Sequence, residues 1–132
     1  MYIEGRGVSQ DNAEAAKWFG KAAEQGNAKA QCNLGMMFFQ GKGVSQDDDE
    51  AIKWLSMAAG NVEPFALNHL GKMHANGEGV EQNYVVAYAF FKFAIDFGYE
   101  AAQKSFETLS EKMTSAQITE AEKILRGEGI AF

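Results

Sequence analysis

Apolar residues recur at helical spacing in two neighbouring segments of the chain. In residues 27–39, apolar side chains lie four positions apart, at Ala30, Leu34 and Phe38. In residues 47–59, a second stripe consists of Ala51, Trp54, Leu55 and Ala58. Residues at these spacings share one side of a helix, so both segments are predicted to be amphipathic helices with one buried face.

Polar residues and glycines mark where these two helices begin and end. Asn27 stands where it can cap the first helix, and Asp47 with Glu50 three residues later resembles a capping box at the start of the second. The sequence Gly-Lys-Gly-Val at 41–44 lies between them. Because glycine tolerates positive φ, we predict a tight loop here that joins the two helices into a hairpin.

The whole pattern repeats every 36 residues. A Gly-x-Gly-Val sequence begins at Gly5, Gly41 and Gly77. The same step relates three further sets of positions, which are Ala15, Ala51 and Ala87; Trp18, Trp54 and Phe90; and Ala30, Ala66 and Ala102. Matches that stay in register across three copies predict an array of helical hairpins. In the third copy, Pro64 fits the first turn of its first helix and Asn83 caps its second.

The two ends of the chain differ from a complete repeat. Met1 and Tyr2 align with Met37 and Phe38, so the first unit should consist of a loop at 5–8 and a helix at 11–24. The apolar side of that helix, near Trp18, Phe19 and Ala22, is then expected to be uncovered, and uncovered repeat ends are unfavourable. We favour a natural protein that continues upstream, with dimerisation through this face as the second alternative. At the other end, Thr114 and Gln117 predict the start of a last helix.

The repeat motif resembles a known family. Residues 30–59 follow the pattern Ala-x-x-x-Leu-Gly-x-x-aromatic-x-x-Gly-x-Gly-Val, and then Ala-x-x-Trp and Ala-Ala. This pattern resembles the Sel-one-like repeat, a relative of the tetratricopeptide repeat, and the segment 109–125 resembles the closing helix of many bacterial members. The resemblance covers residues 1–126. It implies an all-α fold, a right-handed α-α superhelix of helix-turn-helix repeats, and a role as an adaptor in protein–protein contact.

The expected organisation is a single domain over residues 1–132. Its predicted parts are a partial repeat at 1–26, repeats at 27–62 and 63–98, and C-terminal capping helices at 99–132.

Composition and charge narrow the classes of partner. Twelve Lys and Arg against eighteen Asp and Glu give a formal net charge of −6. This balance argues against nucleic acid and anionic membrane surfaces, which both call for a basic face. The chain has no run of about 20 apolar residues, so membrane insertion is not expected. It also has no signal-peptide pattern. If an upstream segment is missing, cytoplasmic and exported locations both stay open.

Residues that could carry chemistry do not form a recognisable catalytic or cofactor motif. The Gly-x-Gly-Val loops lack the third glycine and the preceding strand of a dinucleotide site. The acidic run at 47–50 lacks the glycine and the twelfth-position glutamate of a calcium loop, and is interpreted as helix-start charge. His69 and His74 are five apart and so point in different directions on a helix, and His74 takes an aromatic position of the repeat. We therefore predict no metal and no cofactor.

The single cysteine, Cys32, excludes an intrachain disulfide and a multi-cysteine metal site. Cys32 and Asn68 hold equivalent repeat positions, which places His69 next to the column of Cys32. A Cys–His pair could make an activated thiolate, but no third residue is evident that would orient it. The sequence therefore predicts a protein that is not an enzyme. The alternative is a hydrolase, because cysteine-rich members of the family it resembles have been linked to β-lactam binding or hydrolysis; their paired cysteines are missing here.

A binding groove is the better candidate for a functional site. The resemblance implies that the first helix of each repeat lines a concave face, and we expect this face to hold a partner protein or an extended peptide. Lys and Asn would contact the backbone or carboxylates of the peptide, and aromatic residues its apolar side chains. The other interpretation is that these are ordinary solvated side chains. The predicted groove residues are Lys29, Cys32, Asn33, Met36, Phe39, Gln40, Phe65, Asn68, His69, Lys72, Asn76, Lys104 and Thr108.

Overall fold

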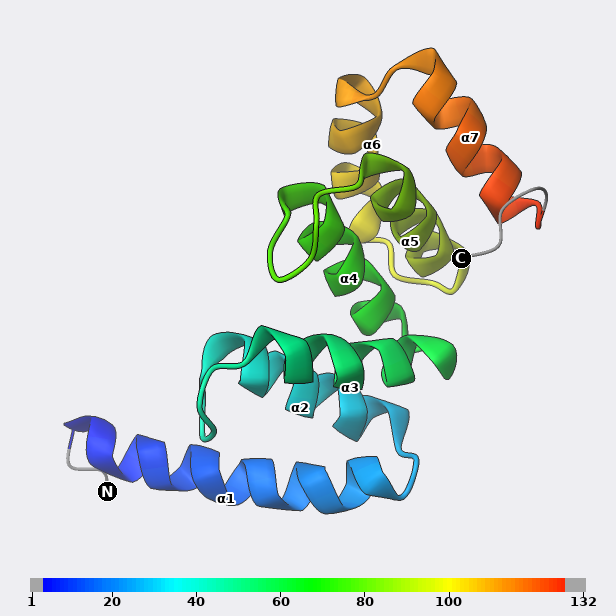
Figure 1. The fold of residues 1–132 in the computed structure, drawn as a ribbon. Coiled ribbons are helices and arrows are strands. Elements are labelled where there is room, and N and C mark those ends of the chain that lie inside the picture. The colour runs from blue at the N-terminus through cyan, green and yellow to red at the C-terminus, as the bar shows by residue number, and fades with distance from the viewer. Residues whose placement is uncertain (1–3, 128–132) are drawn as a thin grey trace. The chain divides into compact units, whose positions relative to one another are not determined.

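The backbone consists of helices joined by short turns and loops. The computed structural model describes residues 4–127, and side chains from residue 11 onward; over this range it contains seven helices and no strand. The helices are α1 (Glu4–Glu24), α2 (Ala28–Gln40), α3 (Asp48–Gly60), α4 (Pro64–Asn76), α5 (Tyr84–Asp96), α6 (Ala102–Lys112) and α7 (Ser115–Leu125) (Figure 1). The helices α4 and α5 begin and end 36 residues after α2 and α3. The all-α class and the 36-residue period are therefore confirmed.

The chain divides into two compact units, which we call unit 1 (Met1–Ala66) and unit 2 (Leu67–Phe132). Unit 1 contains α1, α2 and α3, and unit 2 contains most of α4 together with α5, α6 and α7.

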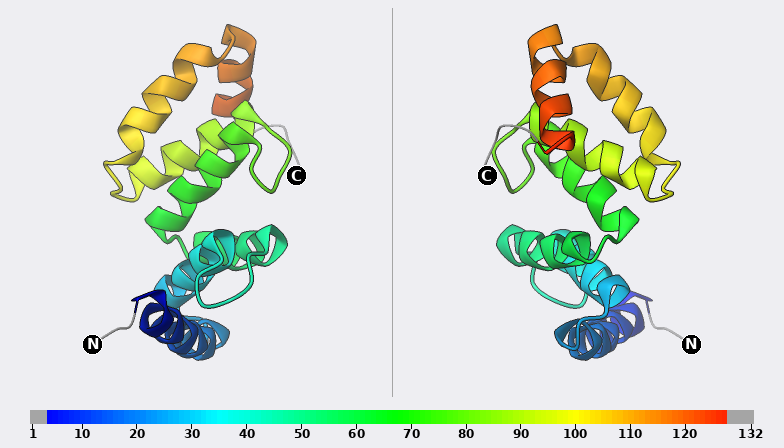
Figure 2. Two further views of the ribbon diagram at one scale, coloured as in Figure 1. Left: turned by 90° about the vertical axis from the view of Figure 1, so that its left-hand side faces the viewer. Right: turned by 90° about the vertical axis from the view of Figure 1, so that its right-hand side faces the viewer.

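In unit 1, α2 lies between α1 and α3 and packs against both (Figure 2). Its buried residues Ala30, Leu34 and Met37 form a core with Ala16 and Ala23 of α1. The close approach of α2 to α3 depends on Gly35. A Cβ atom at Gly35 would lie 2.7 Å from Cγ of Leu55, so a larger residue does not fit without displacing α3.

Unit 2 repeats this close packing with an aromatic partner. A Cβ atom at Gly71 of α4 would lie 2.7 Å from the Phe91 ring of α5, and Phe91 is only 2 % exposed. The helix α5 also contacts α6 and α7. The Tyr88 hydroxyl donates a hydrogen bond of 3.2 Å to the Glu122 carboxylate, which joins α5 to α7. Glycines thus stand at close helix contacts in both units.

The predicted helix starts are confirmed by their hydrogen bonds. The side chains of Asn27, Asp47 and Asn83 each accept a hydrogen bond from a backbone N–H three residues later, at 2.9–3.1 Å. Thr114 and Gln117 form a complete capping box at α7. These contacts satisfy backbone donors that have no partner inside their own helix.

The loop between α2 and α3 has the predicted left-handed glycines. Gly41 and Gly43 have φ of 71° and 76°, and the Gly41 N–H donates to the Met37 carbonyl at 2.7 Å. A Cβ atom at Gly43 would lie 2.2 Å from the Asn12 carbonyl oxygen of α1. Glycine is therefore required at position 43 for two reasons, which are its positive φ and its close contact with the preceding repeat.

The prediction of a loop at residues 5–8 is wrong. The helix α1 begins at Glu4 and continues through this segment to Glu24, instead of beginning near residue 11. The loop at 41–44 is held by hydrogen bonds to the end of α2, whose acceptor is Met37. The residue equivalent to Met37 in the first copy is Met1, outside the described residues, and no described helix precedes the segment. Inside α1, the backbone groups of this segment are satisfied by the hydrogen bonds of the helix.

The apolar side of α1 is more covered than expected. Phe19 and Ala22 pack against the core of unit 1. Trp18 is 62 % exposed, and the Lys21 ammonium lies 4.9 Å from the centre of its ring. The uncovered surface expected near Trp18, Phe19 and Ala22 is thus reduced to Trp18 among these three residues.

Candidate functional site

Unit 2 contains a cavity of about 520 Å³ between α4, α5 and α6, which we call the lysine pocket. The lining residues come from three helices and from the turn before α6. They are Lys72, Ala75, Asn76, Tyr84, Phe91, Ala101, Lys104, Ser105, Thr108, Leu109 and Lys112.

The lysine pocket has an apolar floor and a polar rim. Phe91 and Leu109 are 2 % and 4 % exposed, so they form the floor. The exposed side chains around the rim are Lys72, Asn76, Lys104, Thr108 and Lys112. Such a surface can take an apolar side chain at the floor while the rim hydrogen-bonds to polar groups beside it.

Helical spacing explains how the rim forms. Lys104, Thr108 and Lys112 lie four residues apart on α6, and Lys72 and Asn76 lie four apart on α4. Residues at this spacing share one helix face, so each helix turns a row of polar side chains toward the cavity. Phe91 of α5 reaches the floor beside Gly71, whose missing side chain leaves room for its ring.

The charge of the lysine pocket is of one sign. Its lining contains three lysines and no acidic residue. Among the described side chains, ion pairs join Lys53 to Glu50 and Lys92 to Asp96, and none of the three pocket lysines pairs with a carboxylate. Their charges are therefore available to a ligand.

Unit 1 contains a smaller cavity of about 280 Å³, lined by Lys29, Cys32, Asn33, Glu63 and Phe65. It carries one cation and one anion. The Glu63 carboxylate also accepts a hydrogen bond of 2.8 Å from the Phe65 N–H, at the start of α4. The charge of this cavity is thus balanced within its own lining.

The structure brings together some of the predicted groove residues and leaves out others. Lys72, Asn76, Lys104 and Thr108 line the lysine pocket, and Lys29, Cys32, Asn33 and Phe65 line the smaller cavity. The remaining predicted residues line neither cavity. Of these, Met36, Phe39 and His69 are half-buried, Gln40 is exposed, and Asn68 is only 5 % exposed instead of projecting into a groove.

Sequence reasoning missed several residues that matter to these cavities, among them the floor residues Phe91 and Leu109. Lys112 extends the row of Lys104 and Thr108 by one helical turn, so the i, i+4 spacing could have found it. Tyr84 and Ser105 line the lysine pocket, and Glu63 lines the smaller cavity. These three depend on how helices pack, which no local pattern in the sequence indicates.

The Cys–His pair considered from the sequence lacks the chemistry of an activated thiolate. Burial, and secondly the Glu63 carboxylate, raises the pKa of the Cys32 thiol from 9.0 to about 12. The thiol therefore keeps its proton at neutral pH. Burial and Lys72 lower the pKa of His69, against an opposing effect of Glu78. Cys32 belongs to unit 1 and His69 to unit 2, and neither cavity contains both.

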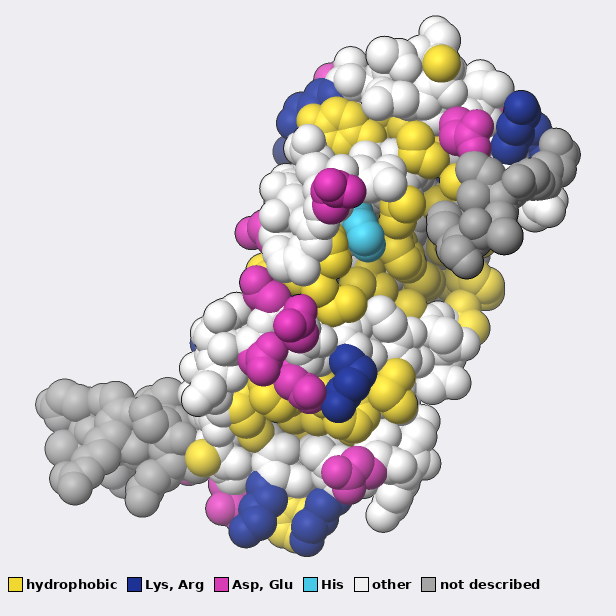
Figure 3. Space-filling view, in the orientation of Figure 1, with side chains coloured by type: hydrophobic (Ala, Val, Ile, Leu, Met, Phe, Trp, Pro, Cys, Tyr) yellow, Lys and Arg dark blue, Asp and Glu magenta, His cyan; other side chains and the backbone are white. Residues whose placement is uncertain are grey.

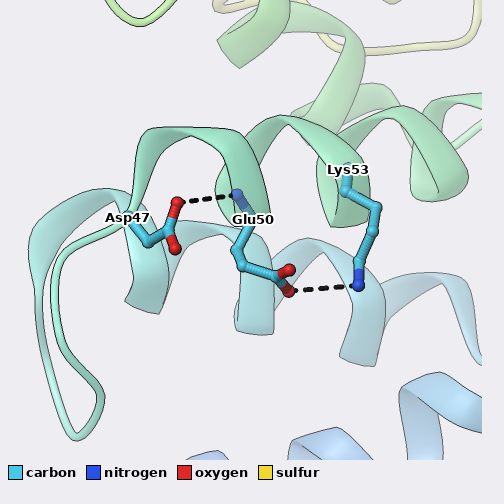
Figure 4. Close-up of polar contacts among 3 residues, drawn as sticks. All are labelled: Asp47, Glu50 and Lys53. Carbon is cyan, nitrogen blue, oxygen red and sulfur yellow. Dashed lines mark hydrogen bonds and ion pairs between the residues drawn. The ribbon is translucent and has the colours of Figure 1, made fainter.

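The other candidates for chemistry have structural roles. The His74 ring stacks on Phe90 with centroids 5.6 Å apart, which confirms it as a packed histidine. Burial lowers its pKa, against a hydrogen bond with the Glu81 backbone. The acidic run gathers at the start of α3 (Figure 3), where Asp47 caps the helix and the Glu50 carboxylate pairs with Lys53 at 3.1 Å (Figure 4).

The part of the chain that the structure describes contains neither a metal-binding cluster nor a membrane-spanning helix. Within that part, no three His, Cys, Asp or Glu residues are grouped so that they could hold a metal ion. None of its helices is both long enough and apolar enough to span a membrane.

Comparison with known proteins gives matches to a family and to solved structures. A family model described as Sel1 repeat matches residues 1–27, 28–61 and 64–98. The chain is similar to the crystal structure of a protective antigen present in uropathogenic Escherichia coli strains, which displays an SLR fold. The TM-score is 0.83 and the identity 34 %, over 87 % of this chain and 25 % of that one.

A Sel1 repeat protein from Oxalobacter formigenes is similar with a TM-score of 0.68 and 36 % identity, over 71 % of this chain and 38 % of that one. The chain thus spans about a quarter and about two fifths of these two proteins. No curated protein matches.

Proposed function

The chain belongs to the Sel1 repeat family, and we propose that it is a non-enzymatic scaffold that holds an extended segment of a partner protein in the lysine pocket of unit 2. Proteins of this family are generally scaffolds for protein interaction. The lining of the lysine pocket supports this pocket as the binding site.

The observation that carries the proposal is the combination of a buried apolar floor with a mixed polar rim. Phe91 and Leu109 offer an apolar contact for one side chain of a bound segment. The Asn76 amide and the Thr108 hydroxyl can each donate and accept, so they can bond the N–H and C=O groups of an extended backbone. A segment without secondary structure needs both kinds of partner, because its backbone groups lose water on binding.

A hydrolase is not favoured. The nucleophile in that alternative would be Cys32, and its raised pKa keeps the thiol protonated and poorly nucleophilic at neutral pH.

The test is a selection from a displayed library of random ten-residue peptides against the whole chain, followed by binding measurements on two variants. Thr108→Trp places a large ring in the rim of the pocket. Thr119→Trp makes the same change at an exposed position of α7 that does not line the pocket, and serves as the control. Circular dichroism establishes that both variants keep the helical content of the parent.

We expect the selected peptides to lose affinity for Thr108→Trp by about tenfold or more, because the ring fills space that the peptide needs. The Thr119→Trp control should bind them like the parent. If folded Thr108→Trp binds every selected peptide as well as the control does, the lysine pocket is not the binding surface.

A further inference from the structure

We propose that the segment held in the lysine pocket is acidic, with two carboxylate side chains about four residues apart and an apolar side chain midway between them. This inference rests on the proposed function, since it specifies what the same pocket binds.

The lysine pocket contrasts in charge with the rest of the chain. Acidic residues outnumber basic ones, eighteen to twelve. Three lysines nevertheless surround one cavity whose lining contains no acid. The smaller cavity described in unit 1 shows the other arrangement, because there Lys29 is balanced by Glu63. A pocket of one sign in a protein of the opposite net sign favours a ligand with complementary charge.

The spacing of the lysines on α6 matches the spacing of side chains in an extended segment. Lys104 and Lys112 are eight residues apart on α6, which corresponds to a rise of about 12 Å along the helix axis. An extended chain advances about 3.3 Å per residue, so side chains four residues apart are separated by about 13 Å. An extended segment that runs beside α6 can therefore place one carboxylate at each of these lysines, while Lys72 faces the cavity from α4.

The residue between the two acids faces the apolar floor of the pocket. Side chains i, i+2 and i+4 of an extended chain point to the same side. When residues i and i+4 face the lysines of α6, residue i+2 faces the same cavity, near its middle. The buried floor there consists of Phe91 and Leu109, so an apolar side chain is the complementary choice. The resulting pattern is acidic-x-apolar-x-acidic.

The experiment uses a labelled peptide, Ser-Glu-Ser-Phe-Ser-Glu-Ser, capped by acetyl and amide groups so that its only charges are the two glutamates. Three related peptides isolate the features of the pattern. One has both Glu replaced by Gln, one has the two Glu side by side, and one has Phe replaced by Ser. Binding to the whole chain is followed by fluorescence anisotropy at low and high salt.

The matched protein variants change the same number of charges in different places. Lys72→Gln/Lys104→Gln/Lys112→Gln removes the three pocket lysines. Lys17→Gln/Lys42→Gln/Lys123→Gln removes three exposed lysines that do not line the lysine pocket. We expect the pocket variant to bind the peptide about tenfold more weakly and the control variant to bind it within about twofold of the parent, since each exposed ion pair contributes modestly. Binding to the parent should weaken as salt rises.

Each other outcome overturns a distinct statement. Equal binding of the Gln peptide, or equal losses in the two triple variants, overturns the acidic preference. It leaves the proposed function intact if Thr108→Trp still weakens the selected peptides. Equal binding of the peptide with adjacent glutamates overturns the spacing. If a Gln peptide with a free carboxyl end binds and the capped acidic peptide does not, the pocket takes a chain terminus and the proposal of an internal acidic segment is wrong.

Discussion

At the scale of single residues, Val62 in the turn between α3 and α4 is the only non-glycine residue with positive φ among the residues that the structure describes. Val62 has φ of 61°, while Gly26 and Gly98, one repeat before and one after it, have φ of 92° and 101°. A β-branched side chain is unfavourable in this region because Cβ crowds the backbone. The repeat thus provides the comparison that identifies Val62 as strained.

Replacing Val62 by glycine should therefore stabilise the protein. We expect Val62→Gly to raise the free energy of unfolding by about 1 kcal/mol, because the relief of strain exceeds the larger entropy that glycine brings to the unfolded chain. Val62 is 43 % exposed, so little packing is lost. The matched reverse change, Gly98→Val, should lower the free energy of unfolding. Urea denaturation measures both, and a less stable Val62→Gly would show that the valine side chain contributes more than its strain costs.

The buried Cys32 thiol makes the stability of the folded chain depend on pH in the alkaline range. Because its pKa rises from 9.0 to about 12 on folding, the thiol stays neutral in the folded state where the unfolded state would lose its proton. The stability that comes from the neutral thiol is complete below about pH 9 and is lost as pH rises toward 12. Tyr88, whose pKa is also raised, first by burial and then by Glu122, acts in the same direction.

The contribution of Cys32 can be separated by comparing slopes. We expect the free energy of unfolding of the parent to fall more steeply between pH 8 and pH 10.5 than that of Cys32→Ala, which lacks the thiol but retains Tyr88. Chemical denaturation at each pH measures the two slopes. Equal slopes would show that the thiol ionises as easily in the folded chain as in the unfolded one.

At the scale of elements, the sequence predicts those features that depend on residues close together in the chain. The caps at Asn27, Asp47 and Asn83 involve residues three apart, and all three were predictable. The loop expected at residues 5–8 shares the Gly-x-Gly-Val sequence of the loop at 41–44 but lies inside α1, so similar local residues gave a different structure. The contribution of Tyr84 to the lysine pocket depends on the packing of α4, α5 and α6, which lies beyond any local motif.

The helix contacts at glycine give opposite expectations for two alanine substitutions. Gly71→Ala would place Cβ 2.7 Å from the Phe91 ring and should lower the free energy of unfolding by about 1–3 kcal/mol. Gly20 lies inside α1 with no atom within 4 Å of an added Cβ, so Gly20→Ala should raise it by about 0.5–1 kcal/mol. Thermal denaturation compares them. If both substitutions raise the free energy of unfolding, helix propensity, and not the contact with Phe91, decides the outcome.

At the scale of the whole molecule, the repeat allowed the all-α class to be predicted from one sequence, because each set of matched positions tests the same pattern again. The candidate site was predicted only in part. The helix faces that carry Lys72, Asn76, Lys104 and Thr108 follow from spacing within each helix, and these residues do line one cavity. The division of the predicted groove residues between two cavities of different charge follows from packing, which the spacing does not specify.

The dimer considered from the sequence can be tested by comparing the area that a stable interface buries with the apolar area exposed near Trp18. A stable interface buries about 800 Å² on each partner, whereas one aromatic side chain supplies about 150–250 Å². Of the three α1 residues expected to be uncovered, Phe19 and Ala22 pack into unit 1 and Trp18 alone is largely exposed. The apolar surface described at this site is thus several times too small. We expect light scattering of the 14.4 kDa chain at micromolar concentration to give the mass of a monomer, unchanged by Trp18→Glu. A dimer mass that Trp18→Glu halves would mean that Trp18 acts with further surface to form an interface.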